Sequence, residues 1–106
     1  MAFILLAGAI VAEVVGTTAL KVSDGFSRLW PSVIVVVGYV VSFVLLALCL
    51  KSMAVGTAYA IWSAVGTALI VAIGVLFFGE SLGPVKLVGI VLVIIGVVLL
   101  NLTSTA

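Results

Sequence analysis

Four long apolar runs, separated by short polar breaks, constrain this chain more than any other feature. The runs cover roughly residues 3–22, 31–50, 57–78 and 85–102. A helix rises about 1.5 Å per residue, so each run can cross a bilayer core about 30 Å thick. Lipid offers no partner to unpaired backbone groups, and four strands cannot close a barrel. The sequence therefore predicts an all-α integral membrane protein with four transmembrane helices.

The composition supports this class and argues against others. Of the 106 residues, 67% are hydrophobic and only 7% are charged, whereas a typical soluble domain is about 25% charged. A net charge of +1 gives no basic surface for nucleic acid. The sequence has no histidine and one cysteine, Cys49, so it has no disulfide framework and no catalytic partner for a nucleophile. We expect no enzymatic activity, no metal and no cofactor.

The short breaks predict one four-helix transmembrane domain over residues 1–106, with no soluble part. Short connections make consecutive helices antiparallel. Basic residues flank the runs on both sides of the membrane, so the bias that fixes orientation is weak. Insertion in both orientations is therefore possible, and one fixed orientation is the alternative. Four helices are too few to enclose a sizeable ligand, so a transport pathway would need a second copy, which would form an inverted pair if it were oppositely oriented.

One acid, Glu13, lies in the middle of the first apolar run, whereas Asp24 and Glu80 fall in the breaks. An ionised side chain at that depth costs on the order of 3 kcal/mol or more, and such acids usually mark ion or proton sites. Burial favours the neutral form of a carboxyl group, and its ionised form attracts cations. We predict that Glu13 binds a proton and a cation in turn. The alternative is a protonated acid that only links neighbouring helices.

Helical spacing supplies candidate partners for Glu13. Residues three or four apart share a helix face, and Trp and Tyr rings hold cations by their faces. The candidates on the first three runs are Leu6, Ile10, Thr17, Tyr39, Phe43, Tyr59, Trp62 and Ser63, with Gly66 on the same face as the last three. Anchoring at the membrane interface is the alternative for Tyr59 and Trp62, and core packing for Tyr39.

Glycines on the fourth run offer a surface for close helix contact. Gly89 and Gly96 are seven residues apart, so they lie on one face, and small residues allow helices in membranes to approach closely. The alternative is that glycine is simply frequent in membrane helices.

Three stretches resemble the small multidrug resistance family: residues 12–21 (AEVVGTTALK), 25–32 (GFSRLWPS) and 58–63 (AYAIWS). The resemblance extends over essentially the whole chain and is closest to the branch that exports quaternary ammonium compounds. It implies an antiparallel homodimer with dual topology that exchanges protons for hydrophobic cations across the bacterial inner membrane. A heterodimer with a paralogue is also possible.

The resemblance also implies roles for particular residues. Glu13 would bind both proton and substrate, Tyr39, Tyr59 and Trp62 would contact substrate, and residues 89–96 would form the dimer seam. Phe3 stands where some members have a pocket-lining Tyr. Ala64 replaces a frequent glycine next to the bend of the third helix, for which Gly66 is the candidate hinge.

The residues after the glutamate separate two branches of the family. Members that export guanidinium compounds usually have a Trp soon after it, whereas this chain has Gly16 and Thr17. This difference favours bulky hydrophobic cations. The alternatives are a guanidinium or polyamine exporter of the same fold, a non-transporting small membrane subunit, and a proton or cation channel.

Overall fold

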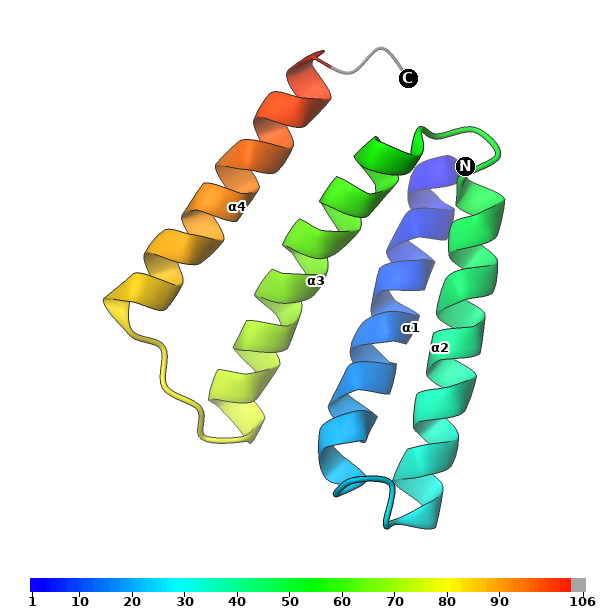
Figure 1. Cartoon of the computed structure of the whole chain (residues 1–106), viewed down its shortest axis with the longest axis vertical. Helices are drawn as coiled ribbons and strands as arrows, with labels where there is room; N and C mark the ends of the chain where they lie inside the picture. Colours follow the sequence, from blue (N-terminus) through cyan, green and yellow to red (C-terminus); the bar gives the residue numbers. More distant parts are fainter. Residues whose placement is uncertain (104–106) are drawn as a thin grey trace. The chain divides into compact units, whose positions relative to one another are not determined.

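The computed structural model describes residues 1–103, and within them the chain forms four helices (Figure 1). They are α1 (Ala2–Val22), α2 (Leu29–Cys49), α3 (Val55–Phe77) and α4 (Pro84–Thr103). Each is long and apolar enough to cross a membrane. The prediction of an all-helical chain with four membrane-spanning helices is confirmed.

Two helices begin two residues earlier than the apolar runs predicted. α2 begins at Leu29 rather than Pro31, and α3 at Val55 rather than Thr57. The amides of a first turn have no partner within the helix, so the missing N–H of Pro31 costs nothing there. The residues before these helices, Arg28 and Ala54, have extended backbones. Each helix therefore begins where the backbone leaves the extended conformation.

The chain divides into two compact units, residues 1–52 and the part from residue 53 onward. In the first unit α1 and α2 pack side by side and antiparallel, and in the second α3 and α4 do so (Figure 1). No residue of α4 from 84 to 102 is buried. The prediction of one four-helix domain over residues 1–106 stays a prediction.

The turn between α1 and α2 is held by Ser23, whose side chain is fully buried. Its hydroxyl donates to the Leu20 carbonyl at 2.7 Å and accepts from the Phe26 amide at 3.1 Å. Asp24, Gly25 and Phe26 all have positive φ, at 50°, 69° and 66°. Only glycine adopts this region without steric cost. The serine bonds therefore hold a strained turn that reverses the chain within a few residues.

Small residues bring the backbones of α1 and α2 into contact. A Cβ atom added to Gly38 would lie 3.0 Å from the Ala12 carbonyl oxygen and 3.1 Å from the Gly16 Cα. Nearby, the fully buried Ser42 hydroxyl donates to the Ala9 carbonyl at 2.8 Å. Without a hydrophobic force between helices in lipid, such close packing and interhelical hydrogen bonds hold them together. The first unit is thus a tightly packed helix pair.

Ser42→Ala is expected to destabilise this pair by about 0.5–1.5 kcal/mol, because one buried interhelical hydrogen bond is lost. The loss is limited because the Ala9 carbonyl keeps its place in the hydrogen-bond ladder of α1. Unfolding in mixed micelles of increasing denaturing detergent would measure the change. Ser81→Ala, in an exposed loop, is the control. Equal stability of the two variants would show that the Ser42 bond contributes nothing.

Candidate functional site

A chain of three hydrogen-bonding groups links α1 to α2 at Glu13. The Thr17 hydroxyl donates to Glu13 Oε1 at 2.8 Å, and Thr17 Oγ1 lies 2.8 Å from the Tyr39 hydroxyl. A threonine hydroxyl has only one hydrogen. When Glu13 is ionised, Thr17 gives that hydrogen to Glu13, so Tyr39 is the donor in the second bond. Glu13, Thr17 and Tyr39 are all half-buried.

Local sequence explains why these groups meet. Thr17 follows Glu13 by four residues, so the two side chains lie on one face of α1. Gly16 leaves space for the ring of Tyr39, since a Cβ there would lie 3.0 Å from two ring carbons. Gly38, next to Tyr39, brings the α2 backbone against α1. The two glycines therefore let the Tyr39 ring lie close enough to α1 for its hydroxyl to reach Thr17.

The surroundings of Glu13 suit a carboxylate that binds a proton and a cation in turn. Thr17 supplies one hydrogen-bond donor to Glu13. The neighbouring helix α2 contains no charged residue, so it supplies hydroxyls and apolar surface but no counter-ion. A carboxylate in this setting can bind either a proton or a positively charged ligand.

The other predicted residues of the first unit lie in two different environments. Leu6 and Ile10 are buried in the chain, whereas Phe3 and Phe43 are exposed. The structure brings Thr17 and Tyr39 to Glu13 and does not include these four in the hydrogen-bonded chain. Their roles as substrate contacts stay predictions.

In the second unit, Tyr59 and Trp62 form an aromatic pair on α3. Their ring centroids are 6.0 Å apart and the planes meet at 67°, an edge-to-face arrangement that aromatic pairs prefer. Tyr59 is 64% exposed, and Ser63, next along the helix, is also exposed. Gly66 is buried within an unbroken α3. Contact of the pair with substrate and the hinge role of Gly66 stay predictions.

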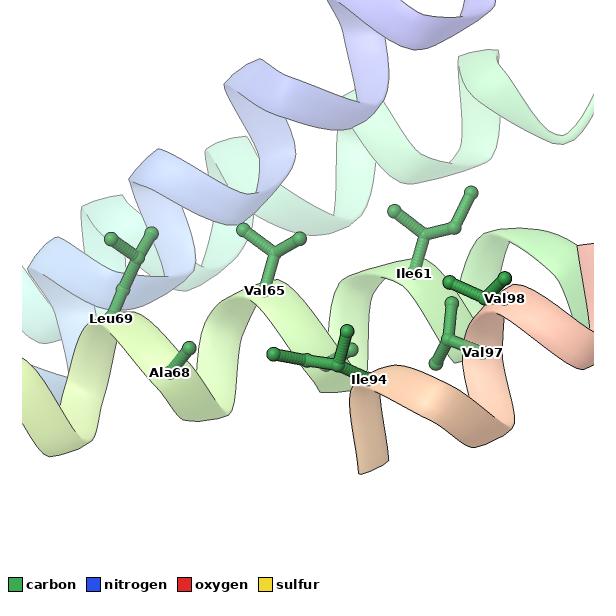
Figure 2. Close-up of a pocket in the computed structure, with 8 residues that line it drawn as sticks. Ile61, Val65, Ala68, Leu69, Ile94, Val97 and Val98 are labelled. Carbon is green, nitrogen blue, oxygen red and sulfur yellow. The ribbon is translucent and has the colours of Figure 1, made fainter. Parts of the chain in front are cut away.

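A hollow of about 340 Å³ lies between α3 and α4, and its side chains are all aliphatic (Figure 2). Figure 2 shows Ile61, Val65 and Leu69 on α3 with Ile94 and Val98 on α4; Ala64, Ala68 and Val97 complete the lining. With no polar side chain, this hollow can cover the apolar part of a ligand but cannot hold its charge.

The fourth helix leaves its two candidate seam residues open. Beyond the adjoining residues and backbone of α4, a Cβ added to Gly89 or Gly96 would meet no atom of the described residues within 4 Å. Space beside them is what a helix of a second copy requires. The dimer role of both glycines stays a prediction.

Sequence reasoning did not identify the contacts of Ser42 and Gly38 with α1, although a signal for them exists. Gly38 and Ser42 are four residues apart on α2, as are Ala12 and Gly16 on α1. Small residues at this spacing mark helix contacts in membranes. Two facing pairs of this kind would have predicted the α1–α2 contact around Glu13.

Fold and site together define a small multi-pass membrane protein with a hydrogen-bonded acid inside its first spanning helix. Residues 1–93 match the model of the family described as Small Multidrug Resistance protein. The chain belongs to this family.

Named bacterial relatives match nearly the full chain. The multidrug resistance protein mmr of Mycolicibacterium paratuberculosis is 55% identical over 105 residues, which cover 98% of each chain. The multidrug transporter EmrE of Escherichia coli K12 is 49% identical over 96% of this chain and 93% of its own. The quaternary ammonium compound-resistance protein QacE of Escherichia coli is 48% identical over 98% of this chain and 94% of its own. These names describe transport and resistance rather than catalysis.

Proposed function

We propose that this protein is a proton-coupled antiporter that exports hydrophobic and quaternary ammonium cations. The observation that carries the proposal is the half-buried Glu13 in a membrane-spanning helix, which accepts a hydrogen bond from Thr17, itself bonded to Tyr39. The relatives named multidrug transporter EmrE and quaternary ammonium compound-resistance protein QacE support the substrate class. Gly16 and Thr17 follow the glutamate in place of the Trp that is usual in guanidinium exporters, which favours a bulky hydrophobic cation.

Competition at one carboxylate couples the two ligands. Ionised Glu13 attracts the cation from the cytoplasmic side, while the rings of Tyr39, Tyr59 and Trp62 cover its apolar surface. A proton arriving from outside neutralises Glu13 and releases the cation. Each net positive charge that enters contributes about 2.3 kcal/mol per 100 mV of membrane potential. The proton gradient drives the cycle, and no cofactor takes part.

A second copy completes the pathway in this proposal. Two chains of opposite orientation in the bacterial inner membrane place two Glu13 side chains around one chamber. The weak bias of basic residues allows both insertions. The open surface beside Gly89 and Gly96 supports α4 as the contact between copies. A paralogue of similar length could replace one copy.

In proteoliposomes, an imposed gradient of a quaternary ammonium compound is expected to drive proton movement in the opposite direction. A pH-sensitive dye inside the vesicles measures this movement, and guanidinium and spermidine are compared at equal concentration, with protein-free vesicles as the control. If guanidinium or spermidine drove proton movement and the quaternary ammonium compound did not, the protein would be a guanidinium or polyamine exporter of this fold. Proton movement without any added cation would indicate a channel, and none under any condition would indicate a non-transporting subunit.

A further inference from the structure

The hydrogen bonds at Glu13 have a direction, and that direction depends on the state of the carboxyl group. With Glu13 ionised, Tyr39 donates to Thr17 and Thr17 donates to Glu13 Oε1. The single hydrogen of Tyr39 therefore points inward along the chain. Only the lone pairs of the phenol oxygen remain for any other ligand.

We propose that a proton bound at Glu13 Oε1 reverses this chain, so that Tyr39 changes from an acceptor to a donor toward the ligand. Glu13 then donates to Thr17 Oγ1, and Thr17 turns its hydrogen to the Tyr39 oxygen. The hydrogen of Tyr39 must leave that bond and point outward. The proton that arrives stays on Glu13, and the other two groups keep their own hydrogens, so only two O–H bonds rotate.

The packing of the chain suits a reversal that needs no movement of heavy atoms. Gly16 lies against the Tyr39 ring, where a Cβ would be 3.0 Å from two ring carbons. The ring is thus held in place, while its hydroxyl hydrogen and that of Thr17 are free to rotate. Both bonds are 2.8 Å long, a length that suits an O–H donor at either end.

No other titratable group of residues 1–52 lies near Glu13 or Tyr39 in the sequence, so none competes with Glu13 in setting the direction of these hydrogen bonds. In residues 1–52 the remaining ones are the terminal amine, Lys21, Asp24, Arg28, Cys49 and Lys51, each eight or more residues from both Glu13 and Tyr39. α2 itself carries no charged residue. Within this pair, Glu13 is the group whose charge Tyr39 senses, through Thr17.

The consequence of the reversal for transport rests on the antiport proposed above. A cation beside Tyr39 meets oxygen lone pairs when Glu13 is ionised and a hydroxyl hydrogen when Glu13 is protonated. Proton binding thus removes one charge and also turns a second attractive group into a repulsive one. Tyr39 is therefore a specificity residue that makes proton and cation more exclusive than a lone carboxylate would.

Infrared difference spectra of the protein in lipid, without any cation, test the reversal directly. The chain has two tyrosines, so Tyr59→Phe with isotope-labelled tyrosine isolates the C–O stretch of Tyr39, which differs between donor and acceptor states. As pH falls, this band is expected to shift together with the rise of the Glu13 carbonyl band. Thr17→Ser should keep the shift, and Thr17→Val should abolish it.

Two spectroscopic results would overturn the proposal. In one, Glu13 titrates while the Tyr39 band stays fixed, as expected if the proton binds Oε2 and leaves the chain unchanged. In the other, the band shifts equally in Thr17→Val. If Thr17→Val does not fold, the bands of the otherwise unaltered chain and of Thr17→Ser decide the question. Because these spectra need no transport, they distinguish failure of the reversal from failure of the antiporter proposal.

Cation affinity supplies a second, independent measurement. Tyr39→Phe is expected to weaken binding of tetraphenylphosphonium about three- to tenfold at a pH where Glu13 is ionised, the scale of one hydrogen-bonding group. At a pH where Glu13 is protonated, the loss should vanish or become a gain. An equal loss at both pH values would indicate a merely structural role for Tyr39 and would contradict the reversal.

Discussion

Glu13→Gln is expected to weaken binding of a lipophilic cation at least about a hundredfold, or about 3 kcal/mol, and to make the remaining binding independent of pH. Glutamine keeps a carbonyl oxygen that accepts from Thr17, so the α1–α2 contact survives while the charge and the titration are lost. In the unaltered chain, binding should weaken as pH falls, because protons compete for the same oxygen atoms. Calorimetry with tetraphenylphosphonium over a pH series measures both effects.

Two variants control for the loss of a carboxylate in general. Glu80→Gln removes an exposed acid from the loop before α4 and is expected to change neither affinity nor its pH dependence. Glu13→Asp keeps the charge one methylene further back and should retain pH-dependent binding. Full, proton-coupled export by Glu13→Gln would refute the antiporter mechanism and leave Glu13 as a link between helices.

Gly38→Ala should lower the free energy of unfolding by about 1–3 kcal/mol, more than Ser42→Ala does. The added methyl group would lie 3.0 Å from the Ala12 carbonyl oxygen and 3.1–3.2 Å from the Gly16 backbone. Backbone atoms of a helix cannot turn aside as a side chain can, so α1 and α2 must separate. The separation should also lengthen the bond between Thr17 and Tyr39 and weaken cation binding. Detergent unfolding and calorimetry measure the two effects.

Gly89→Ala is the matched control, because a Cβ there meets no atom of residues 1–103 within 4 Å beyond the adjoining part of α4. Alanine is the better helix former by about 1 kcal/mol, so the folded chain should keep or gain stability. If Gly38→Ala were as stable as Gly89→Ala, the close α1–α2 contact would be wrong. Loss of dimer in Gly89→Ala alone would instead support the seam on α4.

The fold class follows from the sequence because lipid leaves few choices. Four apolar runs of membrane-spanning length and three short breaks predict four helices, and the structure has them within residues 1–103. The ends of the helices were less predictable. Pro31 marked the expected start of α2, yet the helix includes Leu29 and Trp30, because a first turn tolerates proline.

The candidate site was predictable in part. Glu13 stands out in the sequence because an acid is costly inside an apolar run, and Thr17 follows from the four-residue period of a helix. Tyr39 was expected near Glu13, but the sequence left packing as an alternative for it. The bond through Thr17 depends on how closely α2 approaches α1, which the spacing along one helix does not specify.

The sequence by itself determined the membrane class, the four helices and the acid around which function is proposed, since each depends on the cost of polar groups in lipid. Only the tertiary structure decided which groups meet that acid. Gly16 and Gly38 let two backbones touch, and this contact places the Tyr39 hydroxyl 2.8 Å from Thr17. Donors and acceptors pair only at contact distance. The hydrogen bond between Tyr39 and Thr17, and with it the proposed response to a proton, therefore depends on that contact.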